Sequence, residues 1–241
     1  MSNIFKVFFS ISTILLLSAC SYFDQEKRQA ELCKNHLDEV YKNSPLNNFT
    51  QQKFLKLLEI RYSLYEEMFS EASLETSMNT DLLAAISFQE SQWDPKAISS
   101  MGVRGMMMVT LETAAIVGVE KRLNPEQNIK GGAKYLAILL DKNIYGKTSG
   151  DQLSISLASY NLGPTNIINI ANTIDKEPSE ITWFDIEAKL DNINGADVNL
   201  RDVDNYSRGQ QAIDYVYRIK NYYDLMAAYS CTDIKDQVTF F

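Results

Sequence analysis

The amino-acid sequence predicts a mostly helical protein. Apolar residues return at helical spacing along most of the chain between residues 49 and 229. Asparagine and threonine residues stand where helices would begin, and proline or glycine where they would end. No two segments show the alternation expected of paired strands. The 241 residues, 45% of them hydrophobic, suffice for one globular domain with a sizeable core.

The charge balance excludes one class of partner. The formal net charge is -8 and the sequence pI is about 4.8. Because an acidic surface repels phosphate backbones, we expect no nucleic acid as a partner. The short runs of mixed charge are typical of solvated helix faces.

The first residues indicate export. Lys6 precedes an apolar run from Val7 to Leu17, and the run ends in Leu17-Ser18-Ala19-Cys20. This pattern is typical of a secretory signal peptide and is too short for a membrane span. Small residues directly before a cysteine resemble the bacterial lipobox, which implies a lipid on Cys20 as the mature N-terminus. An ordinary signal peptide with an incidental Cys20 is the alternative. Ser21 follows instead of aspartate, so we expect a lipid anchor at the periplasmic face of the outer membrane.

Two further cysteines stand near opposite ends of the mature chain. In an oxidising compartment Cys33 and Cys231 can form a disulfide, although two buried free thiols are the alternative. His36 is the one histidine and lies near Cys33 only, whereas a zinc site needs about four ligands. The sequence therefore predicts no metal site.

The chain divides into a prefix, a main domain and a tail. Residues 22–43 are polar and charged, and residues 44–48 read as a turn. Apolar residues at helical spacing between Phe49 and Phe69 predict one amphipathic helix packed on the main domain. We expect a signal peptide at 1–19, a lipid-anchored linker and helical prefix at 20–78, a main domain at 79–228, and a tail at 229–241.

The next predicted helix carries the most informative side chain. Asn79 and Thr80 are candidate N-caps, and Pro95 ends the helix. Glu90 therefore lies in the last turn of an otherwise apolar helix, where its charge opposes the helix dipole. That dipole and partial burial both favour the protonated acid. Glu90 is thus a candidate general acid.

Further helices follow after a loop. Residues 99–105 form a loop with two glycines, and the run Met106, Met107 and Met108 comes directly after it. We expect helices after Thr110, from Asn124 toward Leu140, over residues 151–160, from Pro164 toward Ala171, and over residues 210–229. Residues 174–204 are less regular.

Six short motifs now follow one another in order. They read ESQWDP at residues 90–95, GVRGMM at 102–107, TA at 113–114, NIKGGAKYL at 128–136, SYNLG at 159–163, and YV at 215–216 with Ile219. In this order they resemble the motifs of lytic transglycosylases of the goose-type lysozyme-like superfamily. The resemblance covers residues 80–225 and implies a lysozyme-like helical fold.

One subtype is the most similar, the catalytic domain of membrane-bound lytic transglycosylase F. The superfamily more often has glutamine where Met108 stands, whereas the F type has the Met-Met-Val-Thr found here. That subtype usually carries an N-terminal solute-binding-like domain, for which we see no room between Cys20 and Asn79. Gln211 stands where the F-type pattern would have glutamate.

The resemblance implies a role for each site residue. Glu90 would be the catalytic acid. Substrate-binding or orienting roles would fall to Ser91, Met106, Met107, Met108, Tyr160, Asn161 and Tyr215. Ordinary structural roles compete with several of these assignments: Ser91 as a helix cap, the methionines as core packing, and Tyr160 as a core aromatic. Trp93 can stack on sugar or pack as a buried indole. Asp94, before Pro95, suits a turn better than a second catalytic carboxylate.

The expected function is cleavage of peptidoglycan glycan strands. A lytic transglycosylase would break the β-1,4 bond between N-acetylmuramic acid and N-acetylglucosamine and leave 1,6-anhydro ends, with Glu90 as both acid and base. No cofactor is expected. A goose-type lysozyme that hydrolyses the same bond, and a non-catalytic wall-binding lipoprotein, are the two alternatives. The sequence does not name a protein partner.

Overall fold

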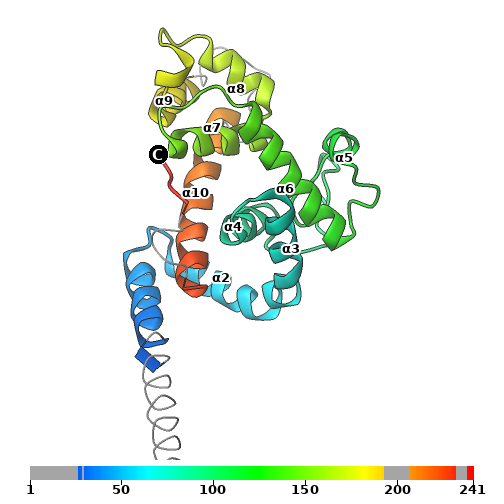
Figure 1. Cartoon of the computed structure of the whole chain (residues 1–241), viewed down its shortest axis with the longest axis vertical. Helices are drawn as coiled ribbons and strands as arrows, with labels where there is room; N and C mark the ends of the chain where they lie inside the picture. The colour runs from blue at the N-terminus through cyan, green and yellow to red at the C-terminus, as the bar shows by residue number, and fades with distance from the viewer. Residues whose placement is uncertain (1–26, 29, 193–206, 232–237) are drawn as a thin grey trace, which may run out of the picture. The chain divides into compact units, whose positions relative to one another are not determined.

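The computed structural model describes residues 27–28, 30–192, 207–231 and 238–241 (Figure 1). The predicted signal peptide and Cys20 lie outside these residues. The chain forms two compact units, residues 1–44 and residues 45–241. In the first unit the described residues are helical as far as Asn43.

Helices build the second unit (Figure 1). They are α2 (Asn48–Ile60), η1 (Tyr62–Leu64), α3 (Glu66–Thr76), α4 (Thr80–Ser91), α5 (Leu111–Val117), α6 (Pro125–Lys142), α7 (Ser149–Leu162), α8 (Pro164–Ala171), η2 (Pro178–Glu180), α9 (Trp183–Asn192) and α10 (Arg208–Tyr229). Among the described residues, strand-like pairing is limited to isolated bridges that join Arg104 to Ile98 and to Val109. The mostly helical fold class is thereby confirmed.

Helix α4 is the centre of this unit. Helices α10, α3 and α6 pack around it, as Figure 1 shows. Every residue of α4 from Asp81 to Phe88 is buried. The Asn79 side chain caps its start by accepting from the Leu82 N–H at 2.9 Å, as the sequence predicts. A helix buried on all sides holds its last turn, where Glu90 lies, in a fixed position.

The prefix forms two helices, so the prediction of one helix from Phe49 to Phe69 is wrong. Helix α2 ends at Ile60, and α3 begins at Glu66 after the short 3-10 turn η1. The break lets Tyr62 turn inward, where its ring lies 5.6 Å from that of Phe69 and 5.2 Å from that of Trp93. Tertiary packing therefore overrides the helical pattern, with no proline or glycine at the break.

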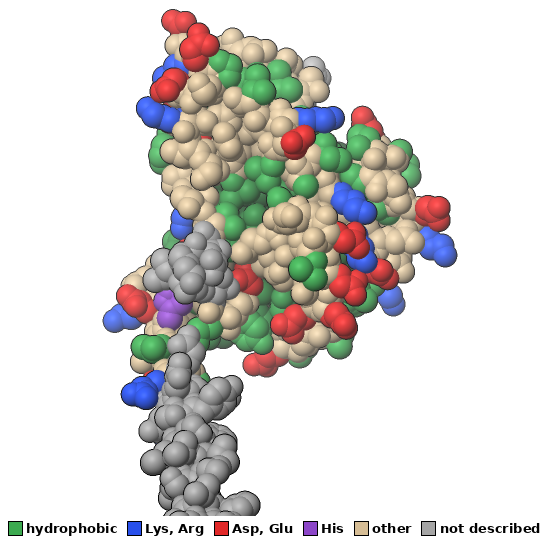
Figure 2. All heavy atoms as spheres, in the orientation of Figure 1, with side chains coloured by type: hydrophobic (Ala, Val, Ile, Leu, Met, Phe, Trp, Pro, Cys, Tyr) green, Lys and Arg blue, Asp and Glu red, His purple; other side chains and the backbone are tan. Residues whose placement is uncertain are grey.

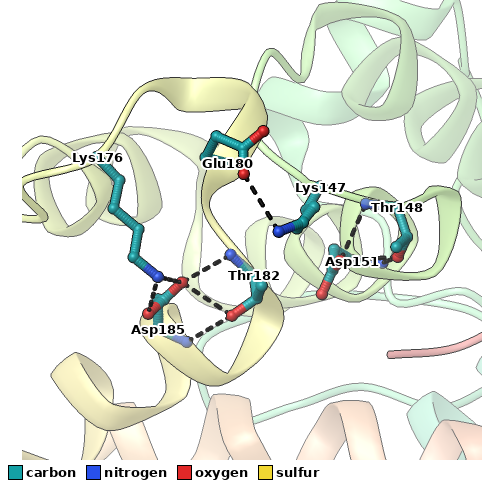
Figure 3. A network of polar contacts seen from close by, with 7 residues as sticks. All are labelled: Lys147, Thr148, Asp151, Lys176, Glu180, Thr182 and Asp185. Carbon is teal, nitrogen blue, oxygen red and sulfur yellow. Dashed lines mark hydrogen bonds and ion pairs between the residues drawn. The ribbon is translucent and has the colours of Figure 1, made fainter.

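A helix also forms where the sequence looked irregular. Within residues 174–204, α9 begins after Thr182, whose N–H and hydroxyl both donate to Asp185 at 2.9 and 2.8 Å. Figure 3 shows this cap and, on α7, the contact of the buried Asp151 with Thr148. Its carboxylate accepts from Thr148 in the capping box of α7 and from the Trp183 N–H at 2.7 Å. The two helix starts are therefore held by one carboxylate.

Helices α7 and α10 begin at Ser149 and Arg208, two residues before the predicted positions, whereas two predicted caps are confirmed. Thr110 caps α5 by accepting from the Thr113 N–H, and Asn124 caps α6 by accepting from the Gln127 N–H, each at 2.9 Å. Helix α8 runs from Pro164 to Ala171, as predicted. Within the described ranges, no helix combines the length and the apolar character needed to cross a membrane.

Candidate active site

Glu90 lies in the last turn of α4, close to a sharp backbone reversal. Gln92 ends the helix with a left-handed φ of 55°, and Trp93 follows with a φ of 57°. Arg61 donates to the Gln92 carbonyl at 3.0 Å, and the buried Trp93 indole donates to the Ala84 carbonyl at 2.9 Å. Trp93 is therefore a packed core indole, not a sugar-stacking one.

The surroundings of Glu90 make it a weak acid. The Tyr215 hydroxyl of α10 donates to Glu90 Oε1 at 2.6 Å. Burial raises the pKa of Glu90 from 4.5 to about 7, and the Tyr215 hydrogen bond lowers it in part. Near neutral pH the carboxyl is therefore about half protonated, which suits a group that gives and then takes a proton.

Burial also affects the two tyrosines near Glu90. The pKa values of Tyr160 and Tyr215 are raised well above 10, mainly by burial and then by the charge of Glu90. Both phenols are therefore neutral donors at physiological pH. The sequence prediction that Tyr215 would hold Glu90 agrees with the geometry.

Ser91 and Tyr160 contact the backbone of the methionine run. Ser91 Oγ donates to the Met106 carbonyl at 2.9 Å, and the Tyr160 hydroxyl donates to the Met107 carbonyl at 2.8 Å. Met106 and Met107 are 0% exposed, so the expectation that they bind substrate is corrected: they are core residues. Met108 is half-buried and lines a cavity.

A cavity with a volume of about 800 Å³ lies next to Tyr160, which interacts with the charge of Glu90. Met108, Tyr160 and Asn161 line it, together with parts of α5, α6 and α8. Glu90 is not among its lining residues, and Tyr160 connects the two. In Figure 2, apolar side chains gather at the centre of the face shown, between the part that carries α7–α9 and the part that carries α3 and α4. Such a cavity can hold an extended ligand of moderate polarity.

The carboxylate nearest to Glu90 in sequence serves a turn. Asp94 Oδ1 accepts from the Lys96 N–H at 2.9 Å, as the sequence favoured. Within the described ranges, no group of three or more histidine, cysteine, aspartate or glutamate residues could hold a metal ion.

The sequence missed two buried polar residues of the site. Ser87 Oγ donates to the Met106 carbonyl at 3.1 Å, and Asn128 Oδ1 accepts from the Met107 N–H at 2.7 Å. Asn128 stands first in one of the six motifs, and that position was the signal that could have found it.

Comparisons with known proteins agree with the motifs. Residues 67–182 match the family described as "Transglycosylase SLT domain". The chain is 34% identical over 211 residues to "Membrane-bound lytic murein transglycosylase F" of Photobacterium profundum, covering 86% of this chain and 40% of that protein. It is 39% identical over 174 residues to "Membrane-bound lytic murein transglycosylase F 2" of Alkalilimnicola ehrlichii, covering 70% of this chain and 38% of that protein. The chain thus spans about two fifths of the length of these relatives.

Two solved structures share the fold. One is an inactive mutant of lytic transglycosylase Slt from Pseudomonas aeruginosa, with a TM-score of 0.50, 16% identity, and coverage of 73% of this chain and 26% of that one. The other is the 70 kDa soluble lytic transglycosylase of Escherichia coli, with a TM-score of 0.51, 19% identity, and coverage of 85% and 31%. The predicted lysozyme-like architecture is confirmed. Residues 67–182 therefore form a domain of the SLT transglycosylase family, and the chain is similar to lytic transglycosylases over this domain and its flanking residues.

Proposed function

We propose that this protein is a peptidoglycan lytic transglycosylase, with Glu90 as its single catalytic acid and base. The observation that carries the proposal is a part-buried glutamate with a pKa of about 7, held at 2.6 Å by Tyr215, together with a cavity of about 800 Å³ lined by Tyr160. Glu90 lies within the family's matched residues. The substrate is the bond between N-acetylmuramic acid and N-acetylglucosamine.

Glu90 acts twice in the proposed reaction. It first donates its proton to the leaving glycosidic oxygen, while the N-acetyl oxygen of the muramic sugar stabilises the charge at the anomeric carbon. The resulting carboxylate then takes the proton of the C6 hydroxyl of the same sugar. That hydroxyl oxygen forms the new bond to the anomeric carbon and closes the 1,6-anhydro ring. An attack within one molecule has high effective concentration and needs no activated water.

The other site residues bind or orient. We propose that Asn161, exposed at the cavity, contacts an N-acetyl group, and that Met108 forms part of the cavity wall. Tyr215 orients Glu90. Ser91 and Tyr160 act through the backbone carbonyls that they bind.

Product analysis tests the proposal. Purified sacculi digested by the protein should yield fragments that end in 1,6-anhydromuramic acid, one water lighter than hydrolytic fragments in mass spectrometry. Reducing muramic acid ends would support the lysozyme alternative, and binding without any cleavage would support the wall-binding lipoprotein. Glu112 is an exposed acid at the cavity, so Glu112→Gln should leave the anhydro product type unchanged. A change to another product with this variant would contradict the single-carboxylate mechanism.

The proposed location follows from the N-terminus. The relatives carry the words "membrane-bound" in their names. We propose that residues 1–19 are a signal peptide, that Cys20 is lipidated, and that residues 20–78 connect the anchor to a catalytic domain at 79–228, with a tail at 229–241. The anchor would place the enzyme at the periplasmic face of the outer membrane. Labelled fatty acid should enter the wild-type protein and not the Cys20→Ala variant; an unlabelled wild-type protein would refute the anchor.

A further inference from the structure

Side chains from three helices, among them α4 that carries Glu90, hold one tight turn. The turn spans residues 104–109 and is closed by the Met108 N–H, which donates to the Gly105 carbonyl at 3.1 Å. Ser87 and Ser91 of α4 donate to the Met106 carbonyl at 3.1 and 2.9 Å. From α7, Tyr160 donates to the next carbonyl. The turn is therefore fixed to the catalytic helix on one side and to α7 on the other.

Asn128 of α6 holds the same turn from a third direction. Its side chain is 0% exposed. The amide oxygen accepts from the Met107 N–H at 2.7 Å, and the amide nitrogen donates to the carbonyls of Arg104 at 2.9 Å and Arg122 at 2.7 Å. One side chain thus binds both ends of the turn and the segment before α6. Because all three partners are backbone groups, no other residue type offers the same donors and acceptor in this volume.

The backbone of the turn is shaped to fit Asn128. Gly105 has a φ of +82°, and a Cβ there would lie 2.4 Å from Asn128 Nδ2 and 2.3 Å from the Arg122 carbonyl oxygen. At the other end of the turn, Met108 has a left-handed φ of 45° although it is not glycine. Such a conformation persists only where its surroundings hold it. The turn therefore holds Met108 at the cavity in a backbone conformation that Met108 keeps only with the support of its neighbours.

The position of the turn relates it to Glu90. Ser87 and Ser91, which bind the turn, stand three residues before and one residue after Glu90 on α4. Tyr160 also bonds the turn. It lies close enough to Glu90 for the Glu90 charge to raise the pKa of Tyr160. The turn is thus bonded to the catalytic helix on both sides of Glu90 in the sequence, and to a tyrosine that interacts with the Glu90 charge.

We propose that Asn128 is a positioning residue for the reaction: it fixes the turn that shields Glu90 and places Met108 at the cavity wall. The inference rests on the proposed function for its kinetic part only. Asn128 is fully buried, so it acts through the turn and not by touching the glycan. Without its three hydrogen bonds the turn would relax, water would reach Glu90, and the carboxyl would titrate closer to 4.5.

Few titratable groups influence Glu90. Among the described residues that pack around it, Tyr215 of α10 donates a hydrogen bond to it, and Tyr160 of α7 interacts with its charge. No charged group of α3 or α6 contributes to its shift. If Asn128 is replaced by a neutral residue, a change in the titration of the Glu90 carboxyl would therefore reflect its exposure to water and not a new charge.

The test compares two substitutions on one helix. Asn128→Leu is neutral, close in volume and removes all three hydrogen bonds. The matched control, Asn124→Leu, removes the exposed N-cap of the same helix and leaves the turn untouched. For each folded protein we would measure kcat and KM on a soluble uncross-linked glycan, and the titration of the Glu90 carboxyl by carbon-13 NMR.

The two variants should differ. For Asn128→Leu we expect kcat to fall by about 10- to 100-fold, as displaced site groups cause, and the Glu90 titration to move at least one pH unit lower. Asn124→Leu should keep the wild-type values of both. Equal kcat or equal titration in the two variants would overturn the proposal. If Asn128→Leu does not fold, the smaller neutral substitution Asn128→Ser decides: it cannot make all three hydrogen bonds, and a wild-type titration or a wild-type kcat there would overturn the proposal.

The titration also separates this inference from the proposed function. It is measured on Glu90 itself and does not require turnover. A wild-type protein that leaves peptidoglycan intact would refute the proposed function, whereas an unshifted titration in Asn128→Leu would refute the role of Asn128.

Discussion

At the scale of single residues, Glu90 combines partial burial with one hydrogen bond. The amide of Glu90→Gln is nearly isosteric but cannot donate an acidic proton. Because general acid–base catalysis contributes about 10²- to 10⁴-fold, we expect glycan cleavage to fall by at least that factor. Turnover assays on sacculi would measure it, and near-normal turnover by the folded variant would contradict the assignment.

The same variant should be more stable at alkaline pH. The pKa of Glu90 is about 7 in the folded protein and near 4.5 when unfolded, so the folded state binds the proton more tightly. Wild-type stability is therefore reduced as pH rises from about 4.5 through 7, because the carboxyl must ionise in a buried place. Glu90→Gln has no carboxyl to ionise, so its stability does not fall in this pH range. Urea unfolding should show it about 1–3 kcal/mol more stable at pH 8 and equal to wild type near pH 4.

Tyr215 should set where the activity declines with pH. Its hydrogen bond lowers the pKa of Glu90, so Tyr215→Phe should raise that pKa above about 7. Since the reaction begins from protonated Glu90, the decline of kcat/KM should move to higher pH, with a lower maximum because the acid is less well oriented. Tyr217→Phe is the control, since the Tyr217 hydroxyl bonds Glu187 at 3.0 Å instead. Unmoved profiles in both variants would argue against the tyrosine's role.

At the scale of elements, the prefix helix α2 supports the catalytic helix. The Phe54 ring of α2 is 0% exposed and lies 4.8 Å from the Phe88 ring of α4 and 5.4 Å from the Trp93 ring. This contact explains why residues before the family's matched range of 67–182 belong to the same compact unit. Removal of the prefix would expose the back of the core behind Glu90.

Phe54→Ala should therefore be strongly destabilising. Loss of a buried phenylalanine costs about 3–5 kcal/mol, through lost burial and the cavity left behind. Phe49→Ala on the same helix is the matched control, because Phe49 is 76% exposed. Chemical unfolding of the two variants would measure the difference. Similar losses would contradict the inward packing of α2.

The turn before α5 gives a second comparison of matched variants. Gly105→Ala places a methyl group against Asn128 and adds the strain of a φ of +82°. Gly102→Ala adds similar strain at a φ of +74°, but its Cβ would meet nothing within 4 Å. We expect a loss of about 1 kcal/mol for Gly102→Ala from the left-handed backbone alone, and a clearly larger loss for Gly105→Ala. Thermal unfolding would rank them, and equal losses would contradict the close fit of Gly105.

At the scale of the whole molecule, export of the protein to an oxidising compartment predicts a disulfide between two distant cysteines. We expect Cys33 and Cys231 to form a disulfide in the exported protein, because they are the two cysteines other than the proposed lipid site. A loop of this length would contribute about 2–4 kcal/mol. Thiol titration of the denatured, unreduced mature protein should find no free thiol, and Cys33→Ser should reveal one. Two free thiols in the wild type would refute the pairing.

The sequence by itself determined most of the local structure. Asn79, Thr110 and Asn124 cap the helices that they were expected to cap, because capping joins a side chain to a backbone N–H three residues later. The position of Glu90 at the end of an apolar helix followed from the same local signals. The order of the six motifs then indicated the family by resemblance, before any contact between the motifs was known.

Only the tertiary structure decided features that depend on distant contacts. Tyr62 breaks the expected prefix helix because Trp93, thirty-one positions later, offers its ring a buried partner. Two of the three hydrogen bonds of Asn128 join it to residues 21 and 24 positions away, Met107 and Arg104. Periodicity along one segment carries no information on which distant group will satisfy a buried polar atom. The tertiary structure decides the partner, because burial of a polar atom without a hydrogen bond is unfavourable.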